Sequence, residues 1–336
     1  MKAIKSTNIS TFAEFFQDAL YNAEKGYYIK KIATGRDGDF FTLPELHPIF
    51  GYLISDFLEK KIEEKNVENK DINIIEFGSG RGLLIKDIVE YFKDKNLNIR
   101  YFSVEVGEKA MEYQKNILKN EKKVIFLQEL DGSKLEGKFN IHISNEFFDA
   151  LPCHILKKTK NKIKEIYVDK IKKEFVESKI SSSANKFFKK YYSDIKIPED
   201  FIFEVVPSIE NVFKKLRNFD IILTVDFGYI DFEQRKPQGS IVCYRNHKFD
   251  FNPLENVYQK DISSFVDFWL LEKVARKFGF SVKTIHLWKF ITERNIEKIM
   301  KMFNTDHNLK RLKASLYLNR LLSDFSNFYV FIAEKT

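Results

Sequence analysis

The sequence predicts an α/β fold in which a mostly parallel sheet carries helices on both faces. Strand-like and helix-like segments alternate between residues 73 and 144, and three glycines cluster where the first of these strands passes into a helix. Such alternation is typical of parallel sheets, whose strands end at one ligand-binding edge. The chain has 336 residues, of which 44% are hydrophobic, and this supports a sizeable core.

A helical region is expected before the sheet. Residues 10–25 carry one apolar face, and Thr11 and Glu14 have the spacing of a capping box at the start of that helix. Gly26 is placed to end it. Residues 49–65 have the pattern of a second helix.

The elements of the sheet are short apolar runs separated by amphipathic segments. Strands are expected at residues 73–77, 101–105, 124–127 and 139–144, with helices at 83–92 and 109–118. The later elements are strands at residues 221–226, 240–245, 281–287 and 327–333 and a helix at 263–278.

One segment interrupts the alternation. Residues 154–216 contain two strand-like runs, a Ser-rich break and a helical stretch. The predicted organisation therefore has an N-terminal helical region at 1–70, a core formed by 71–153 and 217–336, and a Lys-rich insertion at 154–216.

The basic excess of the chain is confined to the insertion. The net charge is +8, and residues 157–190 alone hold twelve Lys, no Arg and four acidic residues. We interpret this segment first as a solvated insertion and second as a surface for an acidic partner. Arg is the residue that most often binds guanine edges and phosphate groups through two hydrogen bonds, and this segment has none. Nucleic acid is therefore not the expected partner.

Composition favours a cytoplasmic protein without a membrane span. Cys153 and Cys243 are the two cysteines, which excludes a disulfide framework and a Cys-rich zinc module. The histidines lack metal-ligand spacing, so no metal is expected. No apolar run approaches the ~18 residues of a membrane span, and residues 1–10 have the pattern of neither a signal nor a transit peptide.

A glycine motif follows the first strand of the core. Residues 76–82 read Glu-Phe-Gly-Ser-Gly-Arg-Gly, and Gly78, Gly80 and Gly82 let the backbone approach a ligand at a helix N-terminus. Dinucleotide enzymes carry G-x-G-x-x-G for a pyrophosphate, whereas the acid Glu76 suits a ligand with a positive group. S-adenosylmethionine (SAM), with its sulfonium and α-amino groups, fits this pattern. A dinucleotide, or a turn that serves packing alone, are the alternatives.

Two further acidic sites lie after later strands. Glu105 ends the second strand of the core, where an acid takes two ribose hydroxyls of SAM or NAD. After the fourth strand, Asn145, Glu146 and Asp149 lie in the loop at the same edge as the glycines, and they are the candidate catalytic residues. Two carboxylates there could grip a guanidinium and accept its proton. Alternatively, Asp149 caps a following helix and Glu146 pairs with a Lys.

Several longer motifs carry a resemblance to a known family. They are residues 38–45 with 50–51, 76–82, 145–152 and 226–228, and more weakly 244–247, 261–263 and 266–268. Together these motifs resemble the MidA-like methyltransferases, which include the mitochondrial complex I assembly methyltransferase. Two positions depart from the family pattern: Phe227 stands where the family usually has Tyr, and Phe265 where it usually has His.

The resemblance implies a class I methyltransferase (Rossmann-like) fold. Its sheet is mostly parallel with an antiparallel closing strand, and N-terminal helices and an α+β insertion before strand five are added to it. The resemblance implies SAM as the cofactor. Since the mitochondrial branch methylates an arginine of a complex I subunit, it also implies a protein substrate such as a respiratory-complex subunit.

Site residues follow from the same resemblance. The three glycines would line SAM, Glu105 would hold its ribose, and the 38–45 loop, with Thr42 and Pro44, would close over it. The primary interpretation is a SAM-dependent protein arginine methyltransferase. An RNA methyltransferase that uses the 157–190 lysines, and a non-catalytic SAM-binding assembly chaperone, are the alternatives. The sequence does not predict the oligomeric state.

Overall fold

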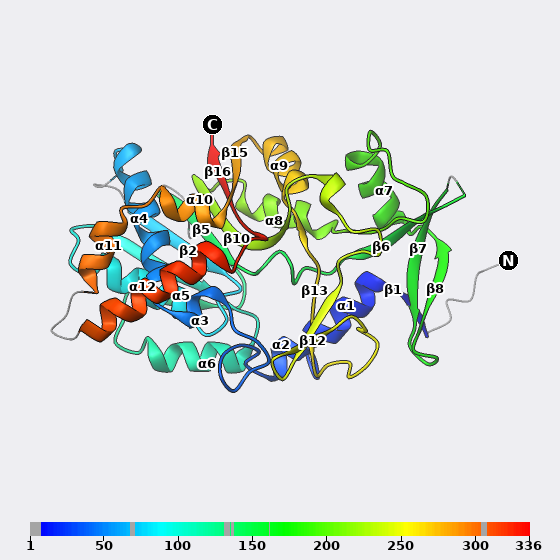
Figure 1. Ribbon diagram of the computed structural model, residues 1–336, viewed down its shortest axis with the longest axis horizontal. Coiled ribbons are helices and arrows are strands. Elements are labelled where there is room, and N and C mark those ends of the chain that lie inside the picture. The colour runs from blue at the N-terminus through cyan, green and yellow to red at the C-terminus, as the bar shows by residue number, and fades with distance from the viewer. Residues whose placement is uncertain (1–7, 68–70, 131–134, 136–137, 161, 304–307) are drawn as a thin grey trace.

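The structure, a computed structural model, describes residues 8–67, 71–130, 135, 138–160, 162–303 and 308–336. A large mixed sheet with helices on both faces lies on the left of Figure 1, and a smaller sheet lies on the right. The N-terminal strand belongs to the smaller sheet, and the C-terminal strand belongs to the larger one (Figure 1).

The central sheet has the predicted α/β topology. Its strands are β2 (Ile72–Phe77), β3 (Ile99–Val104), β4 (Val124–Leu127), β5 (Phe139–Asn145), β10 (Ile221–Tyr229), β15 (Phe280–His286) and β16 (Phe328–Lys335). They lie in the order β15-β16-β10-β5-β2-β3-β4, with β14 (Val266–Asp267) paired to β10. Strand β16 is antiparallel to β10 and to β15, and β2, β3, β4, β5 and β10 pair in parallel. The predicted fold class, including the antiparallel closing strand, is confirmed.

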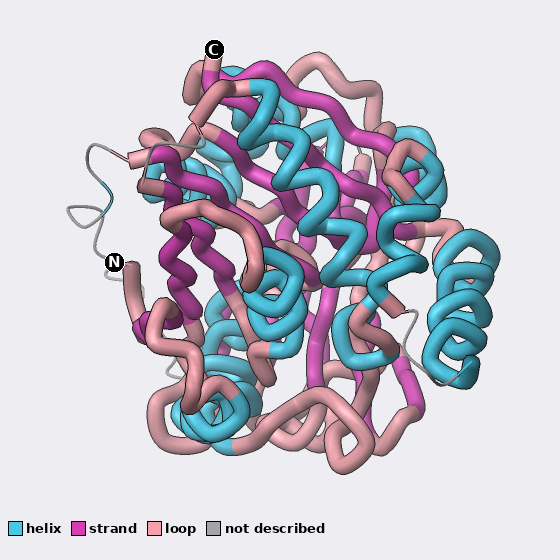
Figure 2. The backbone as a smooth tube through the Cα atoms, turned by 90° about the vertical axis from the view of Figure 1, so that its left-hand side faces the viewer, coloured by secondary structure: helices cyan, strands magenta, loops and turns pink. Residues whose placement is uncertain are grey.

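Helices cover both faces of this sheet. Successive side chains of β2 point to opposite faces, so neighbouring residues pack against different helices. Ile74 packs in a cluster with α4 (Ile49–Glu64) and α5 (Leu83–Phe92), and Ile75 packs with α8 (Ser208–Leu216) and α9 (Phe268–Lys277). The remaining helices of the core region are α6 (Glu108–Ile117), α10 (Leu287–Thr292), α11 (Ile296–Met302) and α12 (Asn308–Ser323). Figure 2 shows helices in front of and beside the strands of the sheet.

The insertion and the N-terminus together build the second sheet. Its strands are β1 (Ile9–Thr11), β6 (His154–Thr159), β7 (Lys162–Asp169), β8 (Glu174–Lys179) and β9 (Ile202–Val205), joined by α7 (Ser182–Tyr191). Strand β7 pairs with β8 along one edge and with β6 and then β1 along the other. The insertion is thus held to the N-terminal region by backbone hydrogen bonds.

The remaining elements lie outside these two sheets. They are α1 (Phe12–Tyr21), α2 (Tyr27–Lys30), α3 (Leu43–Leu46), the 3-10 helix η2 (Phe232–Gln234), and the strands β11 (Val242–Arg245), β12 (Lys248–Asp250) and β13 (Asp261–Ser263). Strand β11 pairs with both β12 and β13. Within the described part of the chain, no helix is both long and apolar enough to cross a membrane.

Local expectations near α1 had mixed outcomes. The capping box is confirmed, because the Glu14 N–H donates to Thr11 Oγ1 at 3.1 Å and the Thr11 N–H donates to Glu14 Oε2 at 2.9 Å. The prediction that Gly26 ends this helix is wrong. Helix α1 ends at Tyr21, and Gly26 instead precedes α2 and accepts the Lys30 N–H at 3.0 Å.

The predicted helix at 263–278 begins too early. Residues up to Asp267 are extended, because β13 pairs with β11 and β14 pairs with β10. This pairing between distant segments overrides the local helical pattern.

Candidate active site

The glycine motif forms a turn that only residues with freedom at positive φ adopt readily. After β2, Gly78, Gly80 and Gly82 have φ values of 63°, 51° and 72°. A Cβ on Gly82 would lie 2.8 Å from the Gln114 Cγ, whereas a Cβ on Gly80 would meet no atom within 4 Å. Gly82 therefore serves close packing at the start of α5, and Gly80 faces open space.

A cavity of about 660 Å³ lies beside this turn. Its lining includes nine of the ten residues predicted for the site: Thr42, Pro44, Glu76, Gly78, Gly80, Glu105, Asn145, Glu146 and Asp149. Gly82 is not part of the lining, because it packs on Gln114 instead. We call this space the large cavity.

Two buried acids, Glu76 and Glu105, are among the residues that line the large cavity. One carboxylate oxygen of Glu76 has no hydrogen-bond partner within the described part of the chain, and burial, followed by the charge of Glu105, raises its pKa well above the usual range. Glu105 accepts the N–H groups of Gly80 and Gly107, each at 2.8 Å, and burial raises its pKa. A buried carboxylate without a partner favours a cation beside it. This fits the α-amino group of SAM.

Residues of the predicted closing loop line the large cavity, and the loop is fixed at both ends. At its start, the buried Asp39 accepts the Tyr27 hydroxyl at 2.6 Å and the Asn246 N–H at 2.9 Å and pairs with Lys31. At its end, Glu45 accepts the Thr34 hydroxyl at 2.6 Å and lies 3.5 Å from the Arg81 guanidinium. The second contact joins the loop to the glycine turn.

The loop after β5 brings Asn145, Glu146 and Asp149 together, and a neighbouring acid shapes it. Asp226, on β10, accepts the backbone N–H groups of Phe147, Phe148 and Asp149 at 3.2, 3.0 and 3.4 Å. Glu146 itself has φ 49°, a conformation that costs a residue with a Cβ about 1 kcal/mol. Asp226 thus holds the backbone of this loop in place.

Neither alternative role for the two loop acids appears in the structure. Residues 146–153 form turns and bends rather than a helix, so Asp149 caps none. Throughout the described residues, Glu146 and Asp149 form no ion pair with Lys or Arg. Glu146 accepts the Asn145 side-chain amide at 3.0 Å and the Leu43 N–H of the closing loop.

The charges of these acids are mutually unfavourable. Burial, and next the charge of Asp226, raises the pKa of Glu146 to about 8. The same two causes raise the pKa of Asp149 well above its usual range. One carboxylate oxygen of Asp149 and the amide oxygen of Asn145 are buried without partners in the described structure. A cationic group would satisfy these oxygens and restore the ionised carboxylates.

A second cavity of about 330 Å³ shares Phe40, Glu146 and Asp149 with the large one. We call it the small cavity. Its other acids are Asp261 and Asp324, and no Lys, Arg or His is among its described lining residues. Seven aromatic side chains also line it: Phe40, Phe41, Phe227, Tyr244, Phe265, Phe325 and Phe328. The two cavities therefore meet at the two loop acids.

Asp261 also lines the small cavity, and in the sequence it belongs only to a weak motif. It accepts the Tyr28 hydroxyl at 2.7 Å and the Ser263 hydroxyl at 2.8 Å, and burial raises its pKa to about 6. Gln259 and Lys260 precede it directly, so the local pattern does not predict a buried acid. Because Asp261 and Glu146 lie far apart in the chain, only the fold brings them to one cavity.

Comparison with known proteins defines the class of enzyme. A sequence profile described as "Putative S-adenosyl-L-methionine-dependent methyltransferase" matches residues 53–285, which is more than half of the chain. The chain therefore belongs to this family of SAM-dependent methyltransferases. The predicted cofactor and enzyme class are confirmed.

The chain is also similar to individual proteins that are named as arginine methyltransferases. The chain is 27% identical over 336 aligned positions to "Protein arginine methyltransferase NDUFAF7, mitochondrial" of Xenopus tropicalis, covering 89% of this chain and 75% of that protein. It is 33% identical over 197 positions to the human protein of the same name, covering 50% of this chain and 44% of that protein. The chain thus matches less than half of the human relative's length. These relatives confirm the predicted MidA-like resemblance.

A solved structure supports the fold. The chain superimposes with a TM-score of 0.83 on a "likely methyl transferase" from Burkholderia thailandensis bound to S-adenosyl-homocysteine. The two share 18% sequence identity, and the match covers 98% of this chain and 88% of that one.

The predicted cytoplasmic location is corrected by the same comparisons. The matching relatives from Xenopus tropicalis, human and Drosophila melanogaster are all named as mitochondrial proteins. The prediction rested on composition and on the pattern of residues 1–10, and the names of these relatives overturn it.

Proposed function

We propose that the protein transfers a methyl group from SAM to an arginine nitrogen of a protein substrate. The observation that carries this proposal is the small cavity, in which carboxylates and aromatic rings occur together without a described basic side chain. Guanidinium groups are bound by paired carboxylates and by aromatic faces. The relatives named as protein arginine methyltransferases support the same substrate class.

The proposed site residues follow from the two cavities. SAM would occupy the large cavity beside Gly78 and Gly80, with Glu76 near its amino group and Glu105 near its ribose. The closing loop, including Thr42 and Pro44, would cover it. When bound, SAM supplies a methyl group on a positively charged sulfur.

The loop acids would then orient the acceptor and manage its proton. Glu146 and Asp149 lie where the cavities meet, so they would hold the guanidinium in line with the methyl group, with Asn145 as a further acceptor. In the transfer, a nitrogen–carbon bond forms as the sulfur–carbon bond breaks, and the nitrogen releases one proton. A carboxylate with a raised pKa is suited to take that proton.

The test uses the protein with labelled SAM and an extract that contains unmethylated proteins. We expect label in protein that is recovered as methylarginine after acid hydrolysis, and mass spectrometry then locates the modified residue. The Glu146→Gln variant should bind SAM and transfer no label. Label in RNA, or on another amino acid, would refute the proposal, and binding of a respiratory subunit without label would favour the chaperone alternative.

A further inference from the structure

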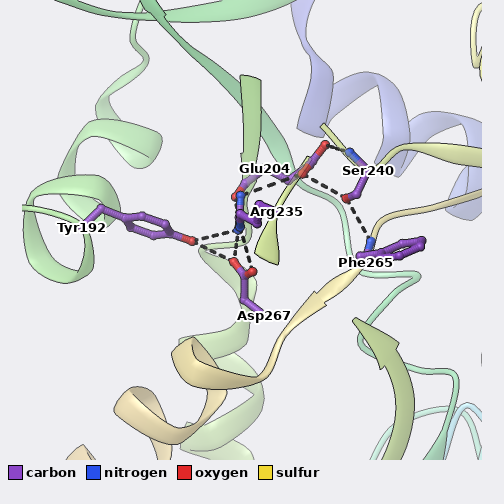
Figure 3. Close-up of polar contacts among 6 residues, drawn as sticks. All are labelled: Tyr192, Glu204, Arg235, Ser240, Phe265 and Asp267. Carbon is purple, nitrogen blue, oxygen red and sulfur yellow. Dashed lines mark hydrogen bonds and ion pairs between the residues drawn. The ribbon is translucent and has the colours of Figure 1, made fainter. Parts of the chain in front are cut away.

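A buried polar network lies behind one wall of the small cavity. Figure 3 shows its members: Tyr192, Glu204, Arg235, Ser240, Phe265 and Asp267. Tyr192 and Glu204 belong to the insertion, Arg235 and Ser240 to the segment after β10, and Phe265 and Asp267 to the β13–β14 segment. Apart from Phe265, which lines the small cavity, no member of this network has a role assigned above.

Arg235 is the centre of the network and is almost fully buried. Its side chain is 4% exposed, its Nε donates to Asp267 at 2.8 Å, and its Nη2 donates to the Glu204 carbonyl at 3.0 Å and pairs with Asp267. The Tyr192 hydroxyl donates to the same Asp267 carboxylate at 3.2 Å. Buried charges of this kind hold their partners in one geometry, because any shift leaves a charge unpaired.

A second branch leads from the insertion to the cavity wall. The Glu204 carboxylate accepts the Ser240 N–H at 2.7 Å and the Ser240 hydroxyl at 3.0 Å. The same hydroxyl oxygen accepts the Phe265 N–H at 3.0 Å. Phe265 lines the small cavity, where its ring contacts those of Phe227 and Tyr229 at centroid distances of 5.1 Å each.

Residues on both sides of Phe265 are also fixed. Asp267 follows it on β14, and Asp261 and Ser263 precede it and line the small cavity. Gly228 allows β14 to lie directly against β10, since a Cβ there would lie 1.9 Å from the Val266 carbonyl oxygen. The network therefore holds Phe265 and Asp267, which are the middle and the end of the segment 261–267. Asp261, at the start of this segment, lines the small cavity.

We propose that Arg235, Glu204 and Ser240 are positioning residues that hold Phe265 as a wall of the small cavity, so that the insertion sets the shape of the acceptor site. This inference rests on the proposed function, because it takes the small cavity as the guanidinium site. Through this network, the insertion controls acceptor binding without touching the acceptor.

Ser240 offers a matched pair of variants. Ser240→Ala removes the hydroxyl that joins Glu204 to Phe265, whereas Ser240→Thr retains a hydroxyl at the same atom position. The position of the ring is followed by ¹⁹F NMR with 4-fluorophenylalanine incorporated at position 265. Binding is followed by titration of methylguanidinium into the protein saturated with S-adenosylhomocysteine, and the affinity for S-adenosylhomocysteine is measured separately.

Loss of one buried hydrogen-bond acceptor should weaken methylguanidinium binding about tenfold. We expect Ser240→Ala to show this loss together with a shifted or broadened ¹⁹F resonance. Its affinity for S-adenosylhomocysteine should stay within about twofold of the wild type, since the network does not touch the large cavity. Ser240→Thr should restore both the resonance and the binding.

The outcomes separate this inference from the proposed function. An unchanged ¹⁹F resonance in Ser240→Ala would overturn the positioning role. So would an equal loss of both ligands, because it would indicate general destabilisation. If methylguanidinium fails to bind the wild type, the proposed acceptor site is wrong, and the ¹⁹F comparison alone then decides whether the network holds Phe265.

Discussion

Replacement of Glu146 by Gln should stabilise the protein at neutral pH while it abolishes methyl transfer. Burial and the neighbouring Asp226 raise the pKa of Glu146 to about 8, from a usual value of 4.5. Between these values the folded protein holds a proton that the unfolded chain has released. The contribution of Glu146 to stability is therefore full below about pH 4.5 and is lost as the pH rises toward 8.

The size of this effect follows from the two pKa values. Each pH unit in the interval removes about 1.4 kcal/mol from the free energy of unfolding. The loss is about 1 kcal/mol at pH 5 and about 4 kcal/mol at pH 8. Gln is a neutral isostere that does not titrate, so the stability advantage of Glu146→Gln over the wild type should grow by about 3 kcal/mol across this range.

Urea unfolding at pH 5 and pH 8, monitored by circular dichroism, measures the difference. Asp87 provides a matched control, because it is a buried acid between α4 and α5 whose pKa burial raises to about 7 and which lines neither cavity. The stability advantage of Asp87→Asn over the wild type should also grow as the pH rises, yet this variant should retain methyl transfer. If the stability advantage of Glu146→Gln over the wild type is the same at both pH values, burial does not disfavour the ionised form of Glu146, and the reasoning is refuted.

Three further predictions concern the two cavities. Gly80→Arg should lower the affinity for SAM at least 100-fold in isothermal titration without unfolding the chain, because the new side chain would enter the open space beside Gly80. A variant with wild-type affinity would disprove the assignment of the large cavity to SAM. Glu105→Gln should lower the affinity for SAM about tenfold in the same titration, and an unchanged affinity would show that Glu105 does not bind the ribose. Asp226→Ala should lower the free energy of unfolding at pH 7 by about 3 kcal/mol, because three N–H groups lose their acceptor, and a loss below about 1 kcal/mol in urea unfolding would contradict its positioning role.

The parts of the fold that the sequence predicted well are those that local patterns determine. Helix α5 (Leu83–Phe92) and strand β4 (Val124–Leu127) have the predicted bounds, because an apolar face or an apolar run marks each one. Strand β8 (Glu174–Lys179) was not predicted. Its residues are mostly exposed, so they carry no alternating apolar pattern, and β8 is held by its pairing with β7.

The candidate site divides in the same way. The large cavity was predictable, because Glu76, Gly78 and Gly80 are near neighbours in one motif and the loop acids follow the adjacent strand of the sheet. The small cavity was not predictable, since Phe40, Tyr244 and Asp261 come from segments that only tertiary packing brings together. The Arg235 network was missed for the same reason.

The energetics of the loop acids favour a cationic acceptor over the alternatives. Glu146, Asp149 and Asp226 are buried within reach of one another's charges, and the loop also holds Glu146 at positive φ. A protein that only bound SAM would bring the single positive charge of the sulfur near three buried carboxyl groups, and part of their repulsion would remain. A phosphate-bearing acceptor would be repelled by the same acids. A guanidinium would instead neutralise them, and the unfavourable energy of the free site would be relieved when the acceptor binds.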